Sequence, residues 1–219
     1  MSVNEISIPS YTRKQETFNA LSHFLGVLIA IVVFVFALNR FINNTLPIYY
    51  FLGLIIFAIS MATVYMISGI YHYLDKENYN KKIFRILDHC SIYLLVAGTY
   101  TPICFVLSST HTIGFVLLTI EWVGAIAGII MKAFFFNNKV TRTIAFFLYV
   151  ILGWLALFSG AFLYIDKTAF AFILGGGITY TIGAILYALG KKNMNFHCVF
   201  HVFVLVSTVI QTIGVILMI

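Results

Sequence analysis

The sequence contains few charged residues, and this shortage excludes most classes of soluble protein. Only 9% of its 219 residues are Asp, Glu, Lys or Arg, whereas soluble globular chains carry roughly a quarter. Apolar residues make up 62% of the chain, and the mean hydropathy is +1.02. Because so few polar side chains cannot coat a soluble globule, most of the apolar surface must face lipid or other helices. We therefore expect one membrane domain.

Cysteine is also scarce, and its distribution excludes cysteine-based architectures. Cys90, Cys104 and Cys198 form no CxxC pair and lie in or beside apolar runs. Neither a disulfide framework nor a thiolate metal cluster is therefore indicated. The first nineteen residues lack the short apolar core and small-residue cleavage site of a secretory signal. We expect the first helix itself to direct insertion.

The basic net charge of +6 raises the question of a nucleic-acid partner. Binding to nucleic acid requires a basic stripe on a solvated domain, and the composition leaves no room for such a domain. In a membrane protein, an excess of Lys and Arg normally marks the cytoplasmic loops. We expect membrane lipids, and no nucleic acid, as partners.

Seven apolar runs indicate the fold. Each approaches the roughly 20 residues that are needed to cross a bilayer, and helices are favoured because a lone strand in lipid leaves its backbone unpaired. The sequence thus predicts an all-α membrane protein, a seven-transmembrane helix bundle over residues 20–219 that follows a cytoplasmic segment over residues 1–19. The runs are Ala20–Leu38, Ile48–Tyr71, Cys90–Leu107, Ile113–Met131, Ile144–Ile165, Ala169–Leu189 and Val199–Ile219.

The positions of the basic residues predict the orientation. Of the thirteen Lys and Arg residues, only Arg40 and Lys167 fall on one side of this topology. Because basic residues accumulate in cytoplasmic loops, the amino terminus is predicted inside and the carboxyl terminus outside. The expected localisation is the cell membrane, with multiple passes. The eleven residues on the other side are Arg13, Lys14, Lys76, Lys81, Lys82, Arg85, Lys132, Lys139, Arg142, Lys191 and Lys192.

Titratable residues converge on the inner side of this topology. His72 ends the second run, Asp88 begins the third helix, and His197 and His201 open the seventh. His197 and His201 are four residues apart, which places both imidazoles on one helix face. Ser68 and His72 have the same spacing on the second helix. Charged or titratable groups in spans are costly, so these five residues are candidates for a functional site.

Three imidazoles at one depth are suited to a metal ion. With an open fourth position they describe a hydrolytic zinc site, in which the metal lowers the pKa of bound water to about 7. His72, His197 and His201 are the predicted ligands, and zinc is the preferred metal, although imidazoles also bind copper, nickel or iron. Asp88 is suited to orient or deprotonate the water, or to fix a ligand imidazole. Ser68 would line the adjacent wall.

Several simpler interpretations stay open. The HxxxH pair fits interfacial histidines that hydrogen-bond to water or lipid headgroups, and Ser68 fits a helix-packing serine. Glu121, in the middle of the fourth run, is expected to be protonated or hydrogen-bonded, and a proton-relay role for it is a weaker alternative. A further polar group at the start of the first helix fits either the floor of the same site or a capped helix start. Its members are Glu16, Asn19, Ser22 and His23.

Taken together, these residues resemble the motifs of the progestin and adipoQ receptor family, whose bacterial branch is the hemolysin III family. The matching residues span nearly the whole chain. The one small departure is Thr99, where the family often has serine. The matches are Glu16-x2-Asn19-x2-Ser22-His23-x2-Gly26, Ser68-x3-His72, Asp88 with Ile92, Gly98, Tyr100 and Pro102, and His197-x3-His201.

The resemblance implies a zinc ion held by His72, His197 and His201, with Ser68 and Asp88 near its water. It also implies membership of a wider group that includes alkaline ceramidases, which hydrolyse lipid amides. The leading hypothesis is therefore a zinc-dependent hydrolase of a membrane lipid amide or ester, or a lipid-homeostasis protein with the same site.

Two other classes of function remain as alternatives. A cytolysin would need a continuous polar pore lining, and because these helices have few polar residues in their outer halves, the pore would have to be a homo-oligomer. A receptor with purely structural zinc is the other alternative, although it would lack a sizeable soluble domain for signalling.

Overall fold

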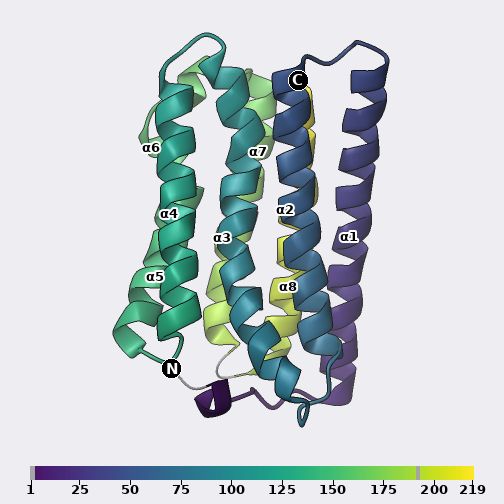
Figure 1. Ribbon diagram of the computed structural model, residues 1–219, viewed down its shortest axis with the longest axis vertical. Helices are drawn as coiled ribbons and strands as arrows, with labels where there is room; N and C mark the ends of the chain where they lie inside the picture. Colours follow the sequence, from purple (N-terminus) through teal and green to yellow (C-terminus); the bar gives the residue numbers. More distant parts are fainter. Residues whose placement is uncertain (1–2, 191–192) are drawn as a thin grey trace.

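The protein is a bundle of long helices that stand side by side (Figure 1). The structure is a computed structural model that describes residues 3–190 and 193–219, and every regular element in these ranges is helical. The elements are η1 (Val3–Glu5), α1 (Arg13–Ile42), α2 (Ile48–Tyr73), α3 (Tyr79–Ser108), α4 (Ile113–Phe135), α5 (Lys139–Gly153), α6 (Leu155–Phe158), η2 (Ala161–Tyr164), α7 (Lys167–Leu189) and α8 (Met194–Leu217).

Six of the described helices are long and apolar enough to cross a membrane, namely α1, α2, α3, α4, α7 and α8. They coincide with six of the seven predicted apolar runs, which confirms the all-helical class. Two of them begin well before the predicted runs, because polar residues cap them outside the apolar stretch. The Thr12 side chain accepts from the backbone N–H of Gln15 and starts α1, and Asn78 accepts from Asn80 and starts α3. The polar extensions place Glu16 and Asp88 on helices.

The fifth predicted run, Ile144–Ile165, is interrupted rather than continuous. Helix α5 ends at Gly153, and the short α6 and η2 follow, with Gly160 between them in a left-handed conformation at φ 74°. In a bilayer, backbone groups freed by such a break need partners from the protein. Tyr100 of α3 supplies them, because its hydroxyl donates to the Gly153 carbonyl and accepts from the Ala156 N–H.

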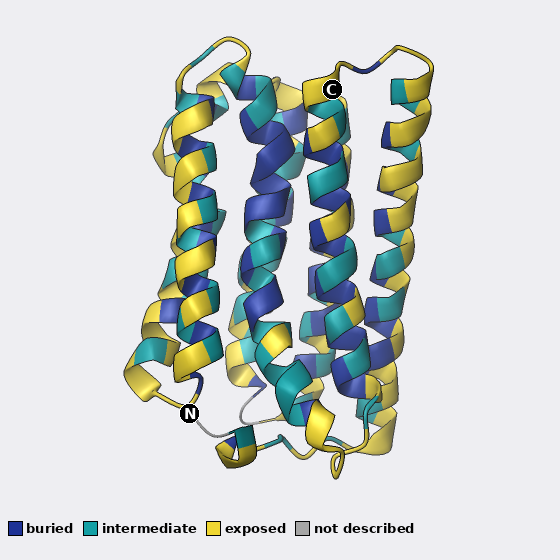
Figure 2. Cartoon of the chain, viewed as in Figure 1, coloured by how far each residue is buried: buried dark blue, intermediate teal, exposed yellow. Residues whose placement is uncertain are grey.

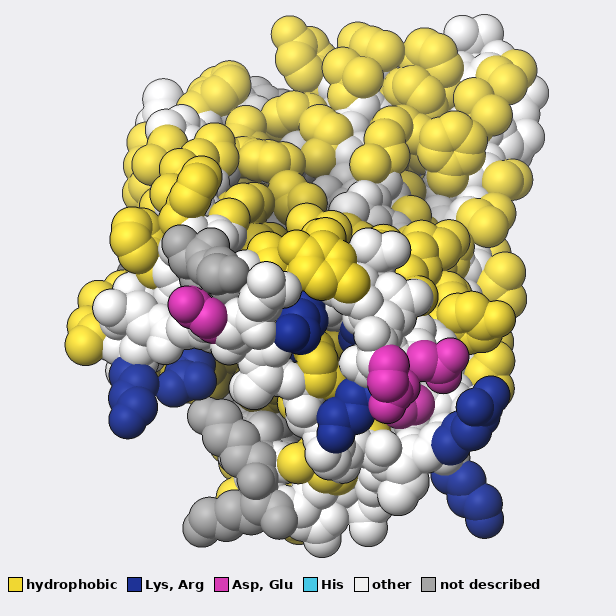
Figure 3. Space-filling model, turned by 60° about the horizontal axis from the view of Figure 1, so that its bottom comes forward, with side chains coloured by type: hydrophobic (Ala, Val, Ile, Leu, Met, Phe, Trp, Pro, Cys, Tyr) yellow, Lys and Arg dark blue, Asp and Glu magenta, His cyan; other side chains and the backbone are white. Residues whose placement is uncertain are grey.

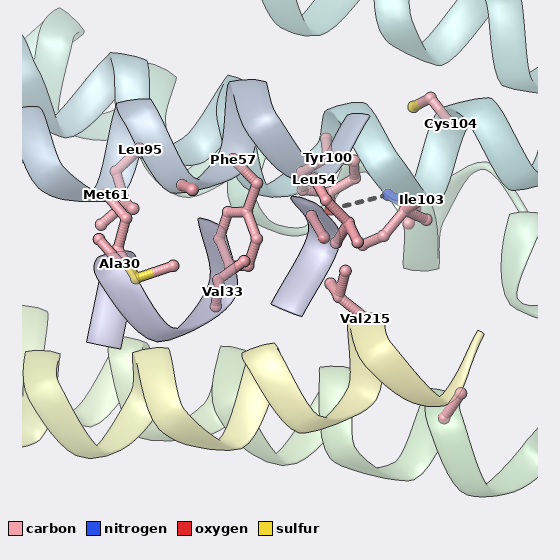
Figure 4. Close-up of a cluster of buried hydrophobic side chains, with 14 of the residues drawn as sticks. Ala30, Val33, Leu54, Phe57, Met61, Leu95, Tyr100, Ile103, Cys104 and Val215 are labelled. Carbon is pink, nitrogen blue, oxygen red and sulfur yellow. Dashed lines mark hydrogen bonds between the residues drawn. The ribbon is translucent and has the colours of Figure 1, made fainter. Parts of the chain in front are cut away.

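Helix α3 lies at the centre of the bundle and is the most buried of the six long apolar helices (Figure 2). It packs against α2 on one side and α4 on the other. The apolar core lies between α1, α2, α3 and α8, as Figure 4 shows for Val33, Phe57, Leu95 and Val215. The site described below is adjacent to this core, so its helices are held by packing along most of their length.

The outward faces of the helices are apolar. On α1, Leu25, Leu28 and Val32 are 55%, 57% and 66% exposed. Charged side chains instead gather at the end of the bundle where η1 lies, while apolar side chains cover the surface away from that end (Figure 3). Such a broad apolar surface is typical of a protein solvated by lipid.

Helix α4 makes close contacts through two glycines. A Cβ on Gly128 would overlap the Tyr93 ring of α3, and a Cβ on Gly124 would lie 2.8 Å from Leu152 of α5. These two glycines, four residues apart, therefore allow close approach to both neighbouring helices. Glu121, on the same helix, is fully buried, and its carboxylate has no hydrogen-bond partner in the described part of the chain. Its role stays a prediction.

Candidate metal centre

Three buried histidines meet where the end of α2 lies beside the start of α8. His72 is in the last turn of α2, while His197 and His201 occupy the first two turns of α8, which the Asn193 side chain caps. They are 2%, 8% and 1% exposed. One ligand nitrogen from each histidine lies within 4.8 Å of the others, so the three imidazoles could hold one metal ion.

Unpartnered nitrogens support this arrangement. Nε2 of His72 and Nδ1 of His201 are buried and have no hydrogen-bond partner among the described residues, and Nε2 of His197 lies 3.0 Å from Nε2 of His201. Leaving a buried polar atom unpaired costs about 1–3 kcal/mol of folding stability. Unpaired nitrogens are therefore expected where a bound ligand supplies the missing partner. A set of neutral imidazoles is a preferred donor set for Zn²⁺ and several other transition metals.

Ser68 and Asp88 face each other beside this cluster. Ser68 is one turn before His72 on α2 and is 2% exposed, and its side chain interacts with the Asp88 carboxylate from α3. Asp88 is not among the three clustered ligands. His89, its neighbour, is not one of the clustered ligands either. Its Nδ1 lies 2.9 Å from the Arg85 carbonyl and 3.6 Å from Oδ2 of Asp88, and its Nε2 lies 3.0 Å from the Tyr187 hydroxyl.

Two members of the polar group at the start of α1, Glu16 and His23, contact this site, whereas the Ser22 hydroxyl donates to the Asn19 carbonyl of its own helix. Capping is done by Thr12 and Gln15, which form a capping box. The Oε2 of Glu16 instead lies 2.6 Å from Nδ1 of His72. The His23 ring packs against His201 with ring centroids 3.9 Å apart, and both its nitrogens are buried without a hydrogen-bond partner in residues 3–190 and 193–219. Of the two interpretations of this group, the geometry favours the floor of the site.

Sequence reasoning missed three residues of the site. Lys81 was counted as a loop charge, yet it is fully buried and its Nζ lies 2.8 Å from Oε1 of Glu16. Its spacing of seven residues from Asp88, which puts both on one helix face, could have indicated this. Tyr11 and Tyr187 both contact His197, with ring centroids 5.1 Å and 5.8 Å away. Burial raises the pKa of Tyr11 above its usual range, so that hydroxyl stays neutral.

A cavity of about 410 Å³ leads to the cluster between the start of α1 and the end of α2. Its lining combines polar residues, among them Glu16 and His72, with apolar residues such as Leu21 and Phe24. An amphipathic wall of this kind suits a molecule with a polar head and an apolar tail.

Comparison with known proteins identifies the family of this chain. The family model described as "Haemolysin-III related" matches residues 11–212. The chain is 37% identical over 198 residues to the "Hemolysin-3 homolog" of Bacillus subtilis (strain 168), covering 89% of this chain and 90% of that protein. It is 34% identical over 195 residues to "Hemolysin-3" of Bacillus cereus, covering 88% and 86%. With its apolar helices, this similarity shows that the chain is a multi-pass membrane protein that belongs to the haemolysin III-related family.

Proposed function

We propose that this protein is a zinc-dependent hydrolase that cleaves an amide or ester bond of a membrane lipid, in the service of membrane lipid homeostasis. The observation that carries the proposal is the buried cluster of His72, His197 and His201, with unpartnered ring nitrogens, next to the interacting pair Ser68 and Asp88. Zinc bound by three imidazoles lowers the pKa of a water molecule to about 7 and polarises a carbonyl group.

The residues of the chain would perform the remaining steps. The Asp88 carboxylate accepts the proton of the attacking water and returns a proton to the leaving amine or alcohol, as a general base and then a general acid. The Ser68 hydroxyl holds that carboxylate in place, or donates a hydrogen bond to the developing oxyanion. The lipid would enter laterally between α1 and α2, with its tails along Leu21 and Phe24 and its head toward His72.

Seven passes complete the proposed topology. The interrupted segment α5, α6 and η2 would be the fifth crossing, within a transmembrane domain over residues 20–219 that follows a cytoplasmic segment over residues 1–19. In Figure 1, η1 and the carboxyl terminus lie at opposite ends of the bundle, as an odd number of crossings requires. The basic residues favour the η1 end as cytoplasmic, although Lys191 and Lys192 lie outside the described residues and Lys81 is buried in the site.

Cysteine labelling tests this topology. On intact cells, a membrane-impermeant maleimide is expected to label Thr110→Cys, in the loop between α3 and α4, and Ile219→Cys. It is expected to label Ser10→Cys only after permeabilisation. The native Cys90 and Cys104 are buried, and Cys198 is partly so, and the unsubstituted protein measures their background. Labelling of Ser10→Cys on intact cells would contradict the proposed orientation.

Lipid turnover by the purified protein tests the hydrolase itself. Wild-type protein in lipid nanodiscs is expected to release fatty acid from at least one member of a panel of ceramides, glycerolipids and acylated amines. A chelator should abolish the release, and added zinc should restore it. Wild-type protein that contains stoichiometric zinc but cleaves no lipid in the panel would contradict enzyme status.

A pore-forming function is the second candidate. The favouring observation is that the matched relatives are named "Hemolysin-3" and "Hemolysin-3 homolog". Such a pore would be a homo-oligomer whose lining comes from facing copies. Dye release from liposomes by wild type, unchanged by loss of the metal, would favour this reading, and a receptor with structural zinc would show neither lysis nor turnover.

A further inference from the structure

Glu16 uses both carboxylate oxygens to join two other helices. Its Oε2 lies 2.6 Å from Nδ1 of His72 on α2, and its Oε1 accepts from Nζ of Lys81 on α3 at 2.8 Å. The Glu16 side chain is 18% exposed, while those of His72 and Lys81 are 1% and 0% exposed. A single side chain of α1 therefore connects the end of α2 with the first turn of α3, beside the histidine cluster.

Lys81 is held on several sides. Besides the Glu16 carboxylate, its Nζ donates to the Leu74 carbonyl at 2.6 Å, and it lies 5.1 Å from the centre of the Tyr71 ring. Burying a lysine in this way costs free energy unless its charge is paired and its donors are satisfied. The ammonium group is thus matched to one specific position of the Glu16 carboxylate, and it restricts where that carboxylate can lie.

The contact with Glu16 determines which nitrogen of His72 is available. A carboxylate accepts hydrogen bonds, so Nδ1 of His72 carries the proton and donates to Oε2. Its Nε2 then has a free lone pair, and this is the buried nitrogen with no partner in the described part of the chain. A carboxylate behind a ligand imidazole also orients the ring and raises its basicity.

We propose that Glu16 and Lys81 are positioning residues for the metal centre. Glu16 holds His72 in the tautomer and ring orientation that presents Nε2 to the ion, and Lys81 holds Glu16 in place. This inference rests on the metal centre of the proposed function and extends it with two residues that are not among its three histidine ligands.

Metal affinity tests the inference without any enzymatic readout. The dissociation constant for Zn²⁺ is measured by competition with a chromophoric chelator, and the visible absorption of the Co²⁺-loaded protein reports ligand geometry. Glu16→Gln is expected to weaken Zn²⁺ binding by about 10- to 100-fold, the usual effect of losing such a partner, and to change the Co²⁺ spectrum. Lys81→Met should weaken binding less, and Lys81→Arg should restore part of the loss because it keeps the charge.

Matched controls separate positioning from general damage. Glu5→Gln removes an exposed carboxylate, and Lys82→Met removes the neighbouring lysine, whose Nζ donates to the Asn4 carbonyl at 3.0 Å. Both should bind metal as wild type does. If Glu16→Gln does not fold, Glu16→Asp tests the positioning role instead. It keeps the negative charge but shortens the side chain that reaches His72, so weaker Zn²⁺ binding is again expected.

The outcomes distinguish this inference from the proposed function. Unchanged affinity and an unchanged Co²⁺ spectrum in folded Glu16→Gln or Glu16→Asp, beside a wild type that binds metal, would overturn the positioning role alone. A wild-type protein that binds no stoichiometric metal would overturn the metal centre and the positioning role together.

Discussion

Replacement of His201 by alanine is expected to abolish stoichiometric metal binding by the purified protein. His201 is 1% exposed, and its ring centroid is 4.8 Å from those of both His72 and His197. Its loss leaves two imidazoles, which cannot complete a three-histidine site. The affinity for Zn²⁺ should fall by more than about 100-fold, the largest effect usual for an outer partner of a ligand. Metal content by elemental analysis and titration with zinc measure the loss.

A second histidine far from the cluster provides the control. His111 lies in the loop between α3 and α4, where its ring packs on Tyr164 with centroids 3.9 Å apart. His111→Ala should retain the metal content of wild type. The thermal unfolding midpoint of each variant shows whether it is folded. A folded His201→Ala protein with a full complement of metal would rule out the proposed ligand set.

Replacement of Asp88 by asparagine is expected to lower lipid turnover by about 10²- to 10⁴-fold, the range typical for loss of a general acid–base group. Asparagine has nearly the same shape but cannot accept a proton at neutral pH. Because Asp88 faces Ser68 and is not one of the three clustered ligands, the variant should keep its metal. The combination of retained zinc and lost turnover would separate a catalytic role from a structural one.

Asp166 offers a matched control for this substitution. It caps α7, where its carboxylate accepts from the backbone N–H groups of Thr168 and Ala169. Hydrogen bonds from Ala169 and its neighbours hold the pKa of Asp166 below its usual range. Asparagine is an equally good N-cap, so Asp166→Asn should preserve both fold and turnover. If Asp88→Asn turned over lipid as fast as Asp166→Asn, the proposed role of Asp88 would be wrong.

Local sequence patterns predicted much of the fold. Apolar runs matched α1, α2, α3, α4, α7 and α8 because mean hydropathy over about 20 residues reports directly on solvation by lipid. The fifth run could not be predicted in the same way. Its composition is as apolar as that of the other runs, but the backbone groups at its break are paired by the Tyr100 hydroxyl, which comes from a different helix.

In the candidate site, too, relations between residues close in the sequence were predictable, and contacts between distant residues were harder to predict. His197 and His201 were recognisable as a pair because helical geometry fixes the relation of residues four apart. That His72 joins them was inferred from its predicted depth and from the family resemblance, and the structure brings the three together. The alternative roles of Glu16 could not be separated from sequence, since a carboxylate in the first turn of a helix is favourable there with or without a distant partner.

The sequence by itself determined that lipid is the solvent of this protein and that imidazole and carboxylate groups lie near one end of its helices, because composition and local periodicity govern both. Only the tertiary structure decided that Glu16 joins Lys81 to His72. These contacts link residues 56 and 65 positions apart. These contacts form because α1, α2 and α3 pack against one another, and no local sequence pattern encodes that packing.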